Sequence, residues 1–248
     1  FMITNQTEQQ TITEIQKPII DENLLIVLQI PITVKQIEGA KEGEVVNGCL
    51  ILKQTANLYK TFMDRKYFST VIAPVLKKMP FDMFFQTANL KNVIMPAVEE
   101  IQKGHTKISA FMGTQVENCY FPQLTTIGAY VFKGCKIKTL NEETFPALQS
   151  VGKAGLMECP IQILNLPNLL QVGALGFSNT RVTHVNLSQL VSVGQDGFSK
   201  CWNLVSFSAP LLKEIGQRCF SGCYRLNQIN CALELNKFIC ETENTPGC

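Results

Sequence analysis

The feature that most constrains this chain is an internal repeat. Each unit begins with a turn residue, usually Pro, and an aliphatic residue follows two positions later. Five consecutive units, 24, 21, 21 and 22 residues apart, start at Pro122, Pro146, Pro167, Ser188 and Pro210. Two weaker units start at Pro74 and Pro96. Self-similarity at such a period is typical of solenoids, in which each unit packs against its neighbours.

The apolar residues within a unit follow a fixed order. Aliphatic or aromatic residues lie six, three and one positions before the next start, as Val182, Val185 and Leu187 do before Ser188. The last two alternate with a period of two, which predicts a short strand with one buried face. An aliphatic-Gly pair and then Phe or Leu follow the turn, and we expect a compact helical turn or irregular segment there.

A unit of about 22 residues cannot bury its own apolar face, so stacking must bury it. We therefore expect one repeat domain over residues 24–231, with about eight or nine units. Residues 1–23 are expected to be an N-terminal cap or linker, and residues 232–248 a C-terminal cap and tail. The segment LLIVLQIP (24–31) has the ending of a further unit, whereas the register over residues 46–58 is ambiguous.

The repeats resemble a known family. The stretches LTTIGAYVFKGC, LVSVGQDGFSKCWNLVSFSAP and LKEIGQRCFSGCYRLNQINC are similar to the BspA-like subclass of leucine-rich repeat proteins, most clearly over residues 122–231. The resemblance implies an α/β solenoid: a right-handed superhelix with a parallel β-sheet on its concave face and short helical or irregular segments on its convex face. Such proteins are typically displayed on the surfaces of bacteria and parasitic protists, where they adhere to host proteins and cells, and their repeats hold no active site.

We accordingly expect a non-enzymatic protein-binding module, at the cell surface or secreted, without a cofactor. The partner would be a protein, such as a host extracellular-matrix or cell-surface protein, or a glycan. The alternative is a structural spacer or an intracellular scaffold in the cytoplasm. The net charge of +2 and the absence of any run of four Lys or Arg argue against nucleic acid. The longest apolar run, residues 24–34, is too short to span a bilayer.

Four of the ten cysteines share one place in their units: Cys135, Cys159, Cys201 and Cys223. Other units hold Thr at this place: Thr87, Thr114 and Thr180. Alternation of small residues predicts a buried packing row, because free Cys behaves as a small hydrophobe; a disulfide between units or a metal site is less favoured. Cys240 and Cys248 fall outside the repeats, where a disulfide in a secreted protein and free thiols in a disordered tail are both open.

The concave face is the usual binding surface of a solenoid. Outward strand positions give the candidate binding face: Ile72, Asn92, Ile94, Asn118, Tyr120, Asn165, His184, Asn186, Ser206, Ser208, Gln228 and Asn230. We expect Ile72, Ile94 and Tyr120 to be exposed anchors for a partner. The alternative is a solvated face whose amides bond along their own ladder. The two histidines, His105 and His184, are expected to be ordinary surface residues.

Overall fold

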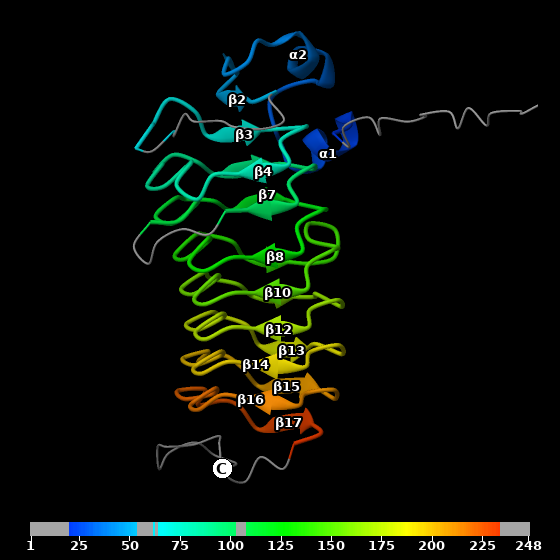
Figure 1. Cartoon of the computed structure of the whole chain (residues 1–248), viewed down its shortest axis with the longest axis vertical. Helices are drawn as coiled ribbons and strands as arrows, with labels where there is room; N and C mark the ends of the chain where they lie inside the picture. Colours follow the sequence, from blue (N-terminus) through cyan, green and yellow to red (C-terminus); the bar gives the residue numbers. More distant parts are fainter. Residues whose placement is uncertain (1–19, 54–61, 63, 103–107, 234–248) are drawn as a thin grey trace, which may run out of the picture.

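The computed structural model describes residues 20–53, 62, 64–102 and 108–233. Figure 1 shows a column of stacked coils, with α1 and α2 at one end and β17 at the other. Two ladders of short parallel strands run along the column, one rung of each per coil. The chain is therefore a leucine-rich-repeat-type solenoid, as the repeat predicts.

The first ladder contains the strands expected before each turn. Its nine rungs among the described residues are β2 (Cys49–Ile51), β3 (Thr70–Ile72), β5 (Asn92–Ile94), β7 (Asn118–Tyr120), β9 (Thr139–Leu140), β11 (Ile163–Leu164), β13 (His184–Asn186), β15 (Ser206–Ala209) and β17 (Gln228–Cys231). They hydrogen-bond in three groups, from β2 to β7, from β9 to β11 and from β13 to β17. Every pairing within these groups is parallel.

The interruption between β7 and β9 adjoins an insertion in the chain. Residues 141–145 fold as a local turn, in which the Phe145 amide donates to the Asn141 carbonyl at 3.0 Å and the Thr144 amide to the Asn141 side chain at 3.1 Å. This turn explains why the step from Pro122 to Pro146 is the longest of the five units.

A second ladder follows the turns. Its rungs are β4 (Lys78–Met79), β6 (Glu100–Ile101), β8 (Thr126–Ile127), β10 (Ser150–Val151), β12 (Gln171–Val172), β14 (Ser192–Val193) and β16 (Glu214–Ile215). Each of these strands ends at the aliphatic residue after the turn, which from β8 onward is followed by Gly, and we expected a helical turn or irregular segment there. Successive turns, rather than helix, then lead to the Phe position, and a residue with positive φ recurs there, such as Leu175 (60°) or Asp196 (55°).

The core lies between the two ladders. The inward residues of the strands are buried along the column, as Val182, Val185 and Leu187 illustrate. Phenylalanine rings stack from coil to coil at centroid distances of 5.6 Å for Phe84–Phe111 and 5.0 Å for Phe111–Phe132. The predicted inward positions are thus confirmed.

The segment before the first rung is helical. α1 (Glu22–Val27) begins at Asp21, whose side chain accepts a hydrogen bond from the Leu24 amide at 2.8 Å, and α2 (Val34–Gly39) begins with a capping box of Thr33 and Gln36. The reading of residues 24–31 as an upstream repeat is therefore wrong, because this end of the chain forms a capped helix instead of a rung. The division of the chain into domains stays a prediction.

The ambiguous register upstream of residue 74 is resolved by β2. This rung pairs with β3 so that Cys49 lies opposite Thr70 and Ile51 opposite Ile72. β1 (Val45–Val46) covers the free edge of β2 in an antiparallel pairing. β2 therefore does not present its own edge for pairing with another chain.

Candidate functional site

We call the side of the first ladder that points away from the core the outer face. Parallel pairing places equivalent outward residues in rows: His184 lies opposite Ser206, and Asn186 opposite Ser208. Within each hydrogen-bonded group, neighbouring rungs are about 4.8 Å apart, so each row forms a line of side chains that is interrupted between β7 and β9 and between β11 and β13. The outer face contains all twelve candidate residues, but the helices divide it into a covered and an uncovered part.

The covered part lies over the first rungs. Ile72 and Ile94 are fully buried in a small second core together with Leu25 of α1 and Ile37 of α2. The prediction that these two isoleucines are exposed anchors is wrong, because the helices before the ladder fold back over them. Their apolar side chains hold the helical segment in place.

Tyr120 lies at the boundary of the covered part. Its ring is half-buried against the same small core. Burial raises the pKa of Tyr120, and the nearby Asp21 carboxylate raises it further. The phenol is therefore neutral at physiological pH.

Beside the covered isoleucines, polar side chains bond along their own row. The Asn118 side-chain amide donates to the Asn92 oxygen at 2.9 Å, and the Asn92 amide donates to the Thr70 hydroxyl at 3.0 Å. This is the amide ladder that the sequence left open as an alternative to binding. Asn92 and Asn118 thus support the sheet.

The uncovered part extends from β11 to β17, and we call it the exposed strip: Ile163, Asn165, His184, Asn186, Ser206, Ser208, Gln228 and Asn230. Two hydrogen bonds cross it, between His184 Nδ1 and the Ser206 hydroxyl at 2.8 Å and from the Asn230 amide to the Ser208 hydroxyl at 3.2 Å. Within the part of the chain that the structure describes, the side chains of Asn165, Asn186 and Gln228 make no hydrogen bond, so their amides are available to a partner.

Ile163 is the apolar residue of the exposed strip. Its side chain is 57% exposed on β11, while its neighbour Leu164 points into the core. The sequence places Ile163 at an outward position, but its surroundings there are amides and hydroxyls, so it did not stand out as an anchor. With Ile72 and Ile94 buried, Ile163 is the exposed one of these three outward isoleucines.

The cysteine row is confirmed as a packing row. Cys135, Cys159, Cys201 and Cys223 are free and buried, and each thiol donates to the carbonyl of the Phe position in the preceding coil, at distances between 3.0 and 3.2 Å. Thr87 makes the same bond to Phe62 at 2.8 Å. Thr87 can stand in for Cys because the place accepts a small side chain with one donor, whereas Thr114 donates to the Phe111 carbonyl of its own coil at 2.7 Å.

Burial determines the chemistry of these thiols. It raises the pKa of Cys135 to about 12, and it also raises the pKa of Cys119 and Cys219. A thiol needs its thiolate form to act as a nucleophile or metal ligand. No group of three or more metal-binding side chains forms among residues 20–53, 62, 64–102 and 108–233. His105, Cys240 and Cys248 lie outside the described residues.

The two ladders, the Phe stack and the Cys/Thr row define a leucine-rich repeat solenoid. Within that class, the model for the "BspA type leucine rich repeat region" matches six copies over residues 104–227, half of the chain. The chain belongs to the BspA-type leucine-rich repeat family. Repeat modules of this class generally bind proteins and are typically non-enzymatic.

Two solved structures are similar to the chain. A leucine-rich repeat protein from Bacteroides ovatus is 18% identical with a TM-score of 0.49, covering 66% of this chain and 49% of that one. A leucine-rich cell surface protein from Faecalibacterium prausnitzii is 14% identical with a TM-score of 0.42, covering 71% of this chain and 68% of that one. This chain thus spans about half of the Bacteroides ovatus protein. Among curated protein sequences, none matches.

In the described part of the chain, neither helix is long and apolar enough to cross a membrane.

Proposed function

We propose that this chain is a non-enzymatic protein-binding module, displayed at the cell surface or secreted, that holds an adhesion partner on its exposed strip. The observation that carries the proposal is the division of the outer face. The helices cover the apolar residues over β3 and β5 but leave the rungs from β11 to β17 uncovered by any described residue. The likeness of the repeats to BspA-like surface proteins supports the location.

The chemistry of the exposed strip suits a protein partner. Ile163 offers one apolar contact, and Asn165, Asn186 and Gln228 surround or extend it with amides that can both donate and accept hydrogen bonds. The stacked coils hold the backbone of these residues in place, so little backbone freedom is lost when a partner binds. A central apolar contact within a polar surround is the usual anatomy of a protein interface.

Binding of the purified chain to immobilised extracellular-matrix proteins, measured by surface plasmon resonance, tests the proposal. Ile163→Glu should weaken the complex by roughly 30-fold, corresponding to about 2 kcal/mol, because it places a charge at the apolar centre of the interface. Ile163 is exposed, so this variant should unfold at the same temperature as the wild type.

The matched control is Leu170→Glu. Leu170 is also an exposed aliphatic residue, but it directly precedes β12 on the second ladder. It should leave binding unchanged. Equal losses in the two variants, or no binding to any matrix protein, would contradict the proposed use of the exposed strip and favour a spacer or scaffold.

A further inference from the structure

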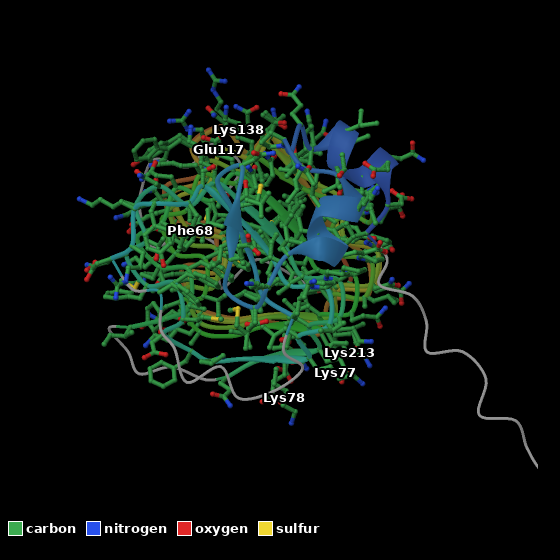
Figure 2. The ribbon with its side chains drawn as sticks, turned by 90° about the horizontal axis from the view of Figure 1, so that it is seen from above. Phe68, Lys77, Lys78, Glu117, Lys138 and Lys213 are labelled. Atoms are coloured by element: carbon green, nitrogen blue, oxygen red, sulfur yellow. The ribbon has the colours of Figure 1, made fainter. Side chains whose placement is uncertain are left out.

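A groove separate from the exposed strip runs along the corner where each coil enters the first ladder. Its volume is about 660 Å³, and five successive coils line it, from Glu117 before β7 to Trp202 before β15. Figure 2, a view along the column, shows Glu117 and Lys138 at this edge and Lys213 at the opposite one. The groove therefore lies along the stack and spans several rungs.

The groove follows from the number of residues in the connection that leads into each first-ladder strand. In four successive coils, one residue separates the Cys/Thr row from the next buried aliphatic residue: Gln115, Lys136, Pro160 and Arg181. The following coil has two residues there, Trp202 and Asn203. The shorter connections line the groove along its length, and the longer one contributes Trp202 in the last of the five coils.

The lining carries excess positive charge. Lys136, Lys138 and Arg181 line the groove, and none of them has an ion-pair partner in the described part of the chain. Two carboxylates line it as well, but Glu158 lies 3.8 Å from Lys133 and is therefore compensated. Glu117 alone opposes the three cations, so the groove favours an anionic ligand.

An exposed aromatic ring completes the lining. Trp202 is 57% exposed, and Arg181 lies beside it in the preceding coil. Exposing the apolar surface of an indole ring to water is unfavourable, and exposed aromatic surfaces often mark contact sites. The C–H faces of sugar rings stack on indole rings, whereas the neighbouring cations would bind carboxylate or sulfate groups.

We propose that this groove binds a linear anionic polysaccharide, whose chain lies along the coils and whose acidic groups meet Lys136, Lys138 and Arg181 while one sugar ring stacks on Trp202. A repeating ligand suits a site that itself repeats at about 4.8 Å. An acidic peptide fits less well, because the groove offers neither an apolar pocket for a side-chain anchor nor a strand edge. The proposal concerns a different surface from the exposed strip and does not depend on it.

Trp202 is the only tryptophan of the chain, so its fluorescence reports directly on the groove. We would titrate the full chain with heparin, hyaluronan, neutral dextran and poly-L-glutamate at low and physiological salt. Heparin or hyaluronan should shift the emission to shorter wavelength, because a bound sugar removes water from the indole. Heparin carries both sulfates and carboxylates, whereas hyaluronan carries carboxylates alone; binding of hyaluronan would therefore show that carboxylates suffice, and binding of heparin alone would assign sulfate. Dextran and poly-L-glutamate should leave the emission unchanged.

Calorimetry on variants completes the test. Arg181→Ala and Trp202→Ala should each raise the dissociation constant at least tenfold. Lys213→Ala, on the opposite edge, and Tyr67→Ala, which removes an aromatic ring of similar exposure (58%), should leave it unchanged. The proposal is overturned if neither polysaccharide binds, if poly-L-glutamate binds equally well, or if Trp202→Ala binds as tightly as the wild type while circular dichroism shows it folded.

Discussion

The Cys/Thr row links single side chains to the stability of the stack. Each member fills a small buried place, and the four cysteines and Thr87 donate to a carbonyl one coil earlier, as Cys135 does to Phe111 at 3.2 Å. An unsatisfied carbonyl at this depth would cost about 1 to 3 kcal/mol. The row therefore tolerates Thr but should not tolerate an aliphatic residue of the same size.

Cys135→Thr tests this reading through pH. Below pH 8 the variant should match the wild type within about 0.5 kcal/mol, because Thr supplies the same donor. Between pH 9 and about 12, the Cys135 thiol is deprotonated in the unfolded chain but keeps its proton in the folded protein. The free energy of unfolding of the wild type should therefore fall by about 1.4 kcal/mol per pH unit relative to that of the variant, which has no thiol at this position. Urea unfolding at several pH values measures the difference.

The reciprocal change, Thr180→Cys, serves as the control. Thr180 occupies the same row and contacts Cys201 at 3.2 Å. A further buried thiol there should make the free energy of unfolding fall more steeply with alkaline pH than it does in the wild type. If the pH profiles of both variants run parallel to that of the wild type, burial of the row does not govern its titration.

Where the second-ladder strands pass into the turns, close contact between the backbones of neighbouring coils limits how large a side chain can be. A glycine follows each second-ladder rung from β8 to β16, and these glycines form a row along the column. A Cβ atom on Gly216 would lie 2.2 Å from the backbone nitrogen of Gln195, whereas one on Gly128 would meet nothing closer than the Val131 side chain at 3.4 Å. The same sequence position is thus under very different constraint in different coils.

We expect Gly216→Ala to destabilise the protein by about 1 to 3 kcal/mol, because the coils must move apart to admit the methyl group. Gly128→Ala, the matched change at the other end of the row, should cost less than about 0.5 kcal/mol. Urea denaturation with a common m-value measures both. Equal effects would mean that glycine recurs in this row because of the turn geometry and not because of close packing.

The sequence predicts the parts of this fold that repeat with a clear period. The apolar positions occupied by Val182, Val185 and Leu187 recur in enough units to define the buried face. The alternation of Cys and Thr defines the packing row. The second ladder was not predictable, since strands of two residues such as Ser192–Val193 are too short to show an alternation. The insertion at residues 141–145 likewise becomes interpretable only once the pairing of β9 with β11 is known.

The candidate site was predictable in part, for a related reason. The repeat assigns Ile72 and Ile163 equally to the outward side of the ladder, but it cannot show which of them another segment covers. Docking of α1 and α2 is a contact between segments distant in sequence, and no local pattern encodes it. The sequence does mark the position of Trp202. The unit that contains it has 22 residues, one more than the preceding unit, and Trp202 lies where the extra residue is inserted.

From end to end, the column behaves as a one-dimensional stack in which each coil contacts its neighbours. Its stability is therefore a sum of local terms, and a change at one end should not be felt at the other. The helical segment belongs to the first coils only, since its small core includes residues of β2, β3 and β5 but none beyond β7. Its removal should expose Ile72 and Ile94 and leave the exposed strip intact.

Leu25→Asp tests this independence. Leu25 is the buried residue of α1, at 1% exposure, and losing its packing alone should cost about 2 to 5 kcal/mol, to which an unpaired buried charge adds. We expect α1 to undock, hydrogen exchange to quicken in β2, β3 and β5, and an environment-sensitive dye to bind the uncovered isoleucines. Val27→Asp, on the exposed side of the same helix, should do none of these. Because each coil contacts only its neighbours, protection from hydrogen exchange in β13, β15 and β17 and binding by the exposed strip should stay at wild-type levels. Faster exchange along the whole column would instead mean that the coils unfold as one cooperative unit.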